Sequence, residues 1–133
     1  MSCYLSIITP TKDRSHKLNQ NLENLLIQNF NNFEWIIIIE KEDQKTIEMI
    51  NSFKKKYSFI KSIIGDFKSI EKAFNIGINK AEGKYILLKP DDDFLSEDAL
   101  STFYENSKEK KDYKWFIGLG EYYKSKRKII IYI

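Results

Sequence analysis

Cysteine, histidine and glycine are all scarce in this chain of 133 residues, and each scarcity excludes a class of site. The lone Cys3 rules out an internal disulfide and fits a reducing compartment. The lone His16 cannot form a histidine cluster, so a metal would need carboxylate ligands. None of the five glycines begins a Walker loop, and Gly118-Leu119-Gly120 is followed by Tyr123 where the dinucleotide fingerprint needs a third glycine.

Long apolar runs and a strong charge of one sign are also missing. No apolar run reaches the ~18 residues of a membrane-spanning helix, and the N-terminus lacks the segments of a signal peptide. The net charge of +3 comes from 22 basic and 19 acidic side chains dispersed along the chain, which argues against nucleic acid as a partner. The densest basic run, 124–128, is typical of a solvated hairpin turn, with contact to phosphate or an anionic membrane as the alternative. We therefore expect a cytoplasmic protein, either free or peripheral at the inner membrane face.

The apolar residues predict strands that alternate with helices. Uniformly apolar segments and a helical periodicity distinguish the two kinds of element. The predicted strands are 5–9, 35–39, 59–64 and 85–88, and the predicted helices include 18–27, 47–53, 70–81 and 100–104. This order indicates a single α/β domain over residues 1–133, with a mostly parallel sheet flanked by helices and ligands beyond the carboxyl ends of the strands. A C-terminal hairpin is expected from 115–123 and 129–133, and Gly83 is expected to cap the third helix.

A run of three acids, Asp91, Asp92 and Asp93, follows the fourth predicted strand. Adjacent carboxylates repel one another, and a divalent ion relieves that repulsion while leaving ligand positions open for water and phosphate oxygens. The simpler alternative is a solvated turn or the cap of the next helix. Ser96 already offers that helix a cap, so the three acids, called the Asp triplet below, are surplus to capping. The Asp triplet therefore favours a metal-assisted diphosphate site at this edge of the sheet.

Four segments share their order and spacing with a known family. They are 6–14, 28–37, 72–86, and the Asp triplet with Leu100 beyond it. Together, from about residue 4 to residue 100, they resemble the N-terminal, nucleotide-sugar-binding portion of a family 2 glycosyltransferase with the GT-A fold. The resemblance implies transfer of a sugar from a nucleotide diphosphate sugar to a hydroxyl of a glycan or lipid-linked acceptor. The donor that it favours is a UDP-sugar. The resemblance also implies Mn or Mg on the diphosphate, acting as a Lewis acid on the leaving group.

The same resemblance assigns residues to the site. The implied donor-binding residues are Thr9, Pro10, Thr11, Glu40, Asp66, Lys72, Asn75, Asp91 and Asp92. The implied metal ligands are Asp92 and Asp93, and a register shifted by one residue would make Asp91 and Asp93 the pair. Thr9-Pro10-Thr11 has a second interpretation, since such a turn is also a plain strand terminator.

Two substitutions depart from the family pattern at the donor site. Glu40 is followed by Lys41, where the family carries a pair of acids after the second strand. Phe74 stands where the family often has Arg. The positive contact to the diphosphate would then be lost or pass to a lysine, for which the candidates are Lys68, Lys72 and Lys89.

The chain stops inside an apolar strand, 129–133, before the segment in which the family carries its acceptor site and general base. Either a partner covers this edge, as in a homodimer, or the fold is truncated after the hairpin. The base is left unassigned, and a second hypothesis is a shortened, catalytically inactive nucleotide-binding or interaction module. A receiver domain of two-component signalling is a weaker alternative, because its acidic pair follows the first strand, where this chain has Thr9-Pro10-Thr11.

Overall fold

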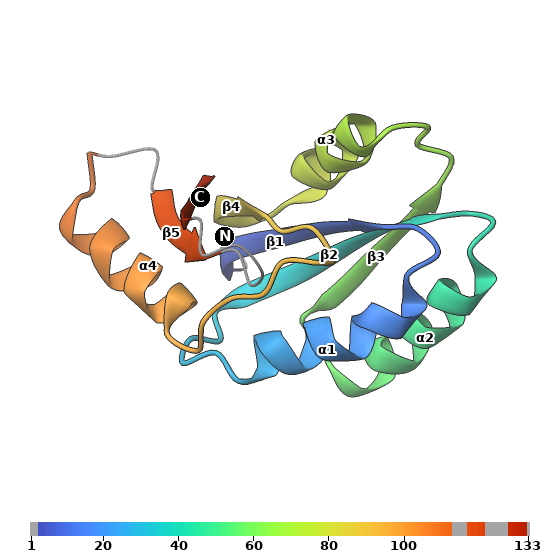
Figure 1. The fold of residues 1–133 in the computed structure, drawn as a ribbon, viewed down its shortest axis with the longest axis horizontal. Helices are drawn as coiled ribbons and strands as arrows, with labels where there is room; N and C mark the ends of the chain where they lie inside the picture. Colours follow the sequence, from blue (N-terminus) through green and yellow to red (C-terminus); the bar gives the residue numbers. More distant parts are fainter. Residues whose placement is uncertain (1–2, 113–116, 122–127, 133) are drawn as a thin grey trace.

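The computed structural model describes residues 3–112, 117–121 and 128–132, in which strands and helices alternate until two strands end the described chain (Figure 1). The strands are β1 (Cys3–Thr11), β2 (Phe33–Glu40), β3 (Ile60–Gly65), β4 (Gly83–Leu88), β5 (Ile117–Glu121) and β6 (Lys128–Tyr132). The helices are α1 (Ser15–Leu26), α2 (Gln44–Lys56), α3 (Ile70–Lys80) and α4 (Ala99–Glu109). The α/β class and the order of elements predicted from the apolar pattern are confirmed.

The first four strands form one parallel sheet in the order β3-β2-β1-β4. β2 lies inside the sheet, and its residues 33–39 are all buried. Such burial on both faces suits the run of isoleucines in β2, because β-branched side chains pack well in a strand that helices cover on both sides. In the register of the sheet, Ile7 pairs with Trp35 on one side and Leu87 on the other. The carboxyl ends of the strands therefore meet at one edge.

Two hydrophobic cores lie on opposite faces of the sheet, because successive residues of a strand point to opposite faces. Trp35 and Ile37 of β2 belong to the core shared with α1 and α2, whereas Ile36 and Ile38 belong to the core under α3. Figure 1 shows α1 and α2 on one side of the sheet and α3 on the other. α4 joins the first core through buried residues that include Phe103. Each covering helix returns the chain to the start of the next strand, so the loops that follow β1 to β4 gather at the same edge.

Gly83 has a different role from the predicted helix cap. Helix α3 ends with Ala81 as its C-cap residue in an extended conformation, and none of the glycines within the described residues has a positive φ. Gly83 instead begins β4, where a Cβ would lie 2.6 Å from the backbone nitrogen of Ser6. The glycine is required by the close approach of β4 to β1, so the prediction of a cap was wrong.

The segment between β4 and α4 also differs from the prediction. Helix α4 begins at Ala99, and its N-cap residue is Asp98 with no side-chain cap hydrogen bond. Ser96 does not cap the helix, since its Oγ donates to Asp98 Oδ1 at 3.0 Å. The stretch from residue 89 to residue 98 has no regular secondary structure. Its backbone groups need partners from elsewhere, and side chains of α1 supply several of them.

The two C-terminal strands pair with each other in a separate sheet. β5 and β6 are antiparallel, with Ile117 opposite Tyr132, as the predicted hairpin requires. Residues 115–116, 122–123 and 133 of that predicted hairpin lie outside the described residues, as do residues 124–127 of the basic run. None of the described helices is long and apolar enough to cross a bilayer.

Candidate functional site

A cleft of ≈ 610 Å³ lies where the loops at the carboxyl ends of β1 to β4 meet the start of α3. Each loop contributes charged residues to it. The charged residues that line the cleft are Lys12, Arg14, Glu40, Glu42, Asp66, Lys68, Asp91 and Asp92. Acids and bases therefore line the same concave surface, at the place where open α/β sheets bind ligands.

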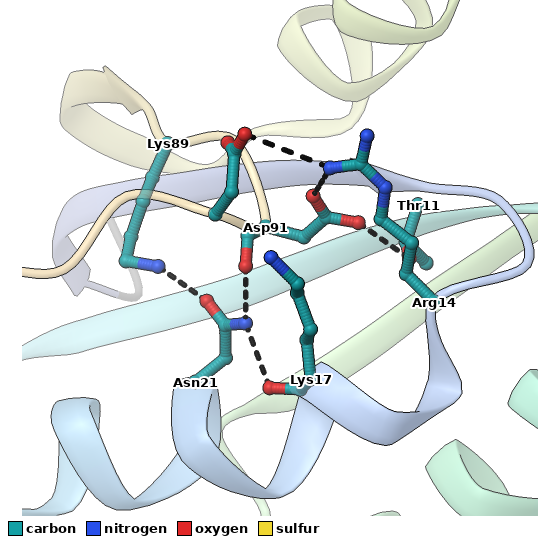
Figure 2. A network of polar contacts seen from close by, with 7 residues as sticks. Thr11, Arg14, Lys17, Asn21, Lys89 and Asp91 are labelled. Carbon is teal, nitrogen blue, oxygen red and sulfur yellow. Dashed lines mark hydrogen bonds and ion pairs between the residues drawn. The ribbon is translucent and has the colours of Figure 1, made fainter.

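The carboxylate of Asp91 is held on both of its oxygens (Figure 2). Oδ1 accepts from Arg14 Nη1 at 2.8 Å, and Oδ2 accepts from the hydroxyl of Thr11 at 2.9 Å. The Asp91 side chain is only 6% exposed, whereas that of Arg14 is 47% exposed. The same Nη1 lies 3.6 Å from Asp92 Oδ2, and the charge of Asp91 raises the pKa of the Arg14 guanidinium. One guanidinium thus bridges two members of the Asp triplet.

Three carboxamide side chains of the N-terminal part of the chain bind the irregular segment that contains the Asp triplet. Asn21 Nδ2 donates to the backbone oxygen of Asp91 at 2.7 Å. Asn24 bonds both backbone groups of Leu95, at 2.8 and 2.9 Å. Gln28, just beyond the end of α1, bonds the backbone of 96 and 100 in the same way. The spacing of these amides, i, i+3 and i+7, places them on one side of the helix, so we call them the amide row.

Lys89 lies beneath the Asp triplet rather than in the cleft. It is 2% exposed, and its Nζ donates to Asn21 Oδ1 and lies 5.5 Å from the centre of the Phe94 ring. Burial lowers the pKa of Lys89 to about 8, although the charges of the Asp triplet act in the opposite direction. Asn21 therefore joins a buried ammonium group to the acidic loop, as Figure 2 shows.

A contact with the N-cap residue of α2 holds the loop that follows β1. Asp13 has a positive φ of 56°, and its backbone N–H donates to Asp43 Oδ2 at 2.9 Å. Asp43 is also the N-cap of α2, where it accepts from the backbone N–H of Thr46 at 3.2 Å. Burial raises the pKa of Asp43, but the hydrogen bonds from Thr46 and Asp13 outweigh it and lower that pKa. One carboxylate thus stabilises both a helix start and the uncommon backbone conformation beside Arg14.

The residues implied by the family resemblance divide into two groups. Those that line the cleft are Pro10, Thr11, Glu40, Asp66, Asp91 and Asp92. The others lie elsewhere. Thr9 is fully buried and accepts from Trp35 Nε1 at 2.9 Å, so its hydroxyl is used within the core. Lys72, Asn75 and Asp93 are exposed outside the cleft lining.

Of the lysines considered as replacements for a missing arginine, Lys68 lines the cleft and Lys72 and Lys89 do not. Phe74, in the place of that arginine, packs against the core under α3. The residues that the sequence did not single out are Arg14, Asn21 and Asp43. The spacing of the amide row was the available signal for Asn21, whereas the contacts of Arg14 and Asp43 depend on segments that only the fold brings together.

The described carboxylates as placed do not form a cluster of three metal ligands. Among residues 3–112, 117–121 and 128–132, no three side chains of His, Cys, Asp or Glu converge on a common point. Both oxygens of Asp91 already have partners, and Asp93 is not among the residues that line the cleft. Partial desolvation, together with the neighbouring Asp92, raises the pKa of Asp93. An ion at the Asp triplet would therefore need ligands besides these side chains, and the predicted Mn or Mg site stays a prediction.

Comparison with known proteins identifies the family. The model of glycosyl transferase family 2 matches residues 6–128. The chain belongs to this family. The resemblance inferred from the four sequence segments is thus confirmed, and the match extends through β5 to the start of β6.

Individual proteins similar to this chain match most of it but are much longer. An uncharacterized glycosyltransferase of Haemophilus influenzae is 35% identical over 97 residues, which are 72% of this chain and 39% of that protein. S. aureus TarS 1–349 in complex with UDP-GlcNAc has a TM-score of 0.72 at 21% identity, covering 80% of this chain and 31% of that one. The mannosyltransferase PcManGT from Pyrobaculum calidifontis, in complex with GDP-Man and Mn²⁺, has a TM-score of 0.68 at 14% identity, covering 76% and 31%. These structures confirm the predicted GT-A fold, and the chain spans less than half the length of each of these three proteins.

Proposed function

We propose that this family 2 chain is the donor-binding part of a glycosyltransferase, which transfers a sugar from a nucleotide diphosphate sugar to an acceptor hydroxyl. The observation that carries the proposal is the cleft at the carboxyl ends of the strands, which is lined by Arg14, Asp91 and Asp92 from the loops after β1 and β4 and by Glu40 and Asp66 at the ends of β2 and β3. This position agrees with the general location of ligands in open α/β sheets.

The donor is proposed to be a UDP-sugar. Support comes from the UDP-GlcNAc complex of TarS, and the GDP-Man complex of PcManGT makes a GDP-sugar the alternative. Carboxylates accept hydrogen bonds from the hydroxyl and N–H groups of a nucleoside, which suits Glu40 and Asp66. A guanidinium binds phosphate oxygens through paired N–H groups, which suits Arg14, with Lys12 and Lys68 as further positive charges.

Several finer predictions remain part of this proposal. They are a Mn or Mg ion at Asp92 and Asp93, a glycan or lipid-linked acceptor, a homodimer through the terminal strand, and a cytoplasmic location that includes the inner membrane face. The Mn²⁺ in the PcManGT complex supports the metal for that fold. No catalytic step is assigned to the metal, and the general base stays unassigned.

Calorimetric titration of UDP and GDP, with and without Mn²⁺, tests the donor site. We expect UDP to bind, and Asp92→Asn to weaken its metal-dependent binding by about tenfold, the loss expected when one charged ligand is removed. Glu48→Gln is the matched control, because Glu48 is an exposed acid of α2 outside the cleft lining. Binding of neither nucleotide would contradict the proposal and favour an interaction module.

A further test separates transfer from mere binding. If the domain activates the leaving diphosphate, UDP-sugar hydrolysis without an acceptor should be slow but measurable, and Asp92→Asn should reduce it. Nucleotide binding without any hydrolysis would support the catalytically inactive nucleotide-binding module instead.

A further inference from the structure

Arg14 occupies the position between Asp91 and Asp92 that a cation would need. Its Nη1 lies 2.8 Å from Asp91 Oδ1 and 3.6 Å from Asp92 Oδ2. We infer that Arg14 is the resident counter-cation of these two carboxylates and competes with a divalent ion for them. The inference rests on the proposed function, because it concerns how the donor site handles a metal.

The charges around the Asp triplet require such a partner. Asp91 is almost fully buried, and an unpaired carboxylate there would be costly. In the described part of the chain, Arg14 is the only basic residue whose side chain forms an ion pair with the triplet. Lys89 is near, but its Nζ donates to Asn21 on the other side of the loop. Arg14 therefore compensates the charge that a metal would otherwise compensate.

The geometry makes the two cations mutually exclusive at Asp91. A divalent ion needs carboxylate oxygens at about 2.0 to 2.6 Å with room for its other ligands. The guanidinium stands at Oδ1, and the Thr11 hydroxyl occupies Oδ2. An ion held by Asp92 and Asp93 would meet the same guanidinium, because Arg14 Nη1 lies 3.6 Å from Asp92 Oδ2. Binding of the ion therefore requires Arg14 to move away.

Arg14 is able to move, and the cleft offers it another partner. Its side chain is half exposed, and as the N-cap residue of α1 it makes no side-chain cap hydrogen bond. A diphosphate in the cleft would present oxygens to the same guanidinium and would release the two carboxylates. Arg14 would then make metal binding depend on the presence of the diphosphate.

The test measures Mn²⁺ affinity without nucleotide, from the electron paramagnetic resonance signal of free Mn²⁺. We expect Arg14→Gln to bind Mn²⁺ about tenfold more tightly than the wild type, because a neighbouring positive charge and a competing donor are removed. Lys12→Gln is the matched control: it removes the same charge from the cleft lining, but Lys12 forms no ion pair within the described residues. We expect a change of about twofold or less for this control, since solvent and salt screen the more distant charge.

Two further variants make the outcome decisive. Adding Asp92→Asn to Arg14→Gln should abolish the gain, because the released carboxylate is then missing. Arg14→Lys keeps the charge on a group that cannot bond two oxygens with a fixed fork, so it should give an intermediate Mn²⁺ affinity and serves if Arg14→Gln fails to fold. Unchanged or weaker Mn²⁺ binding in the Arg14 variants, or an equal gain in Lys12→Gln, would overturn the inference.

UDP titrations of the same proteins keep this inference separate from the proposed function. If UDP binds but Mn²⁺ affinity does not rise in the Arg14 variants, the donor site stands and the competition is refuted. If UDP and GDP bind neither the wild type nor the variants, the proposed function fails, whereas the Mn²⁺ measurement still decides the competition between the ions.

Discussion

Asn21 donates from Nδ2 to the backbone oxygen of Asp91 at 2.7 Å, and its Oδ1 accepts from the ammonium group of Lys89 (Figure 2). A single amide on α1 therefore satisfies the loop that carries the Asp triplet and a lysine buried under it. Because the loop has no regular secondary structure, its position depends on such contacts. The contacts with α1 therefore determine the position of the Asp triplet.

Replacing Asn21 by leucine should destabilise the fold by about 2 to 4 kcal/mol, because the buried Lys89 and the Asp91 carbonyl both lose a partner. Urea unfolding at pH 7 measures the change. Asn19→Leu is the matched control on the same helix, at an exposed position. Removing both partners in Asn21→Leu/Lys89→Met should recover part of the loss, since no buried charge is then left unpaired. A double variant whose loss equals the sum of the single losses would contradict this account.

Asp43 has two functions that separate variants can distinguish. Asp43→Ala removes the cap of α2 and the acceptor for the Asp13 N–H, and it should cost about 1 to 2 kcal/mol in the free energy of unfolding. Asp43→Ser keeps a cap for the Thr46 N–H but is too short to hold Asp13. We expect both variants to weaken UDP binding, but only Asp43→Ala to lose much stability. Wild-type UDP affinity in Asp43→Ser would show that the contact with Asp13 does not matter for the donor site.

The close approach of α3 to the sheet gives a packing prediction at Gly77. A Cβ at this position would lie 2.5 Å from Ile8 Cγ2 and 3.3 Å from Ile38 Cδ1, both in the core under α3. Alanine normally favours a helix over glycine by about 1 kcal/mol, yet we expect Gly77→Ala to destabilise the protein by about 1 to 3 kcal/mol through overpacking. Asn79→Ala, at an exposed position of α3, should instead be neutral or slightly stabilising. Thermal unfolding compares the two variants, and a stabilised Gly77→Ala would show that Ile8 repacks at little cost.

The fold was predictable from the sequence because its signals are local. The isoleucines of β2 and the periodic leucines of α1 each indicate their element without knowledge of the rest of the chain. For the site, the sequence could predict which loops take part but not which of their side chains face the cleft. Thr11 and Asp91, which were assigned to donor binding, do line the cleft. Thr9, which was assigned with them, instead accepts a hydrogen bond from Trp35 in the core. Which way each side chain points depends on neighbours that are distant in the sequence.

Arg14 and Gly83 are two residues whose roles could not be predicted from the local sequence. Arg14 meets an acid 77 residues away, and no local pattern marks an arginine that will serve as a counter-ion. Gly83 follows a helix, where a cap is the usual reason for glycine, but the actual reason is the backbone of Ser6 in the adjacent strand. In both cases the sequence offers a residue type with several uses, and only the packing of the sheet selects one.

Glu34, at the opposite end of the sheet from the cleft, should make stability depend on acid pH. It is 4% exposed, its Oε2 lies 2.5 Å from Lys61 Nζ, and its Oε1 accepts from Ser6 Oγ at 2.6 Å and from the backbone N–H of Glu82 at 2.8 Å. Burial raises the pKa of Glu34, but the bonds from Glu82, Lys61 and Ser6 outweigh it, so the pKa lies below its ordinary value of 4.5.

A carboxylate with a lowered pKa in the folded state stabilises the fold above its unfolded pKa, and this contribution is lost as the pH falls through the folded value. Glu34→Gln should therefore cost about 1 to 2 kcal/mol at pH 7, where the charged contact with Lys61 is missing, and much less at pH 3. Urea unfolding of both proteins at the two pH values gives the difference directly. Because the remaining carboxylates titrate in both proteins, their contributions cancel in that comparison. A difference that stays constant from pH 7 to pH 3 would mean that the charge of Glu34 does not contribute and that only its shape and neutral hydrogen bonds matter.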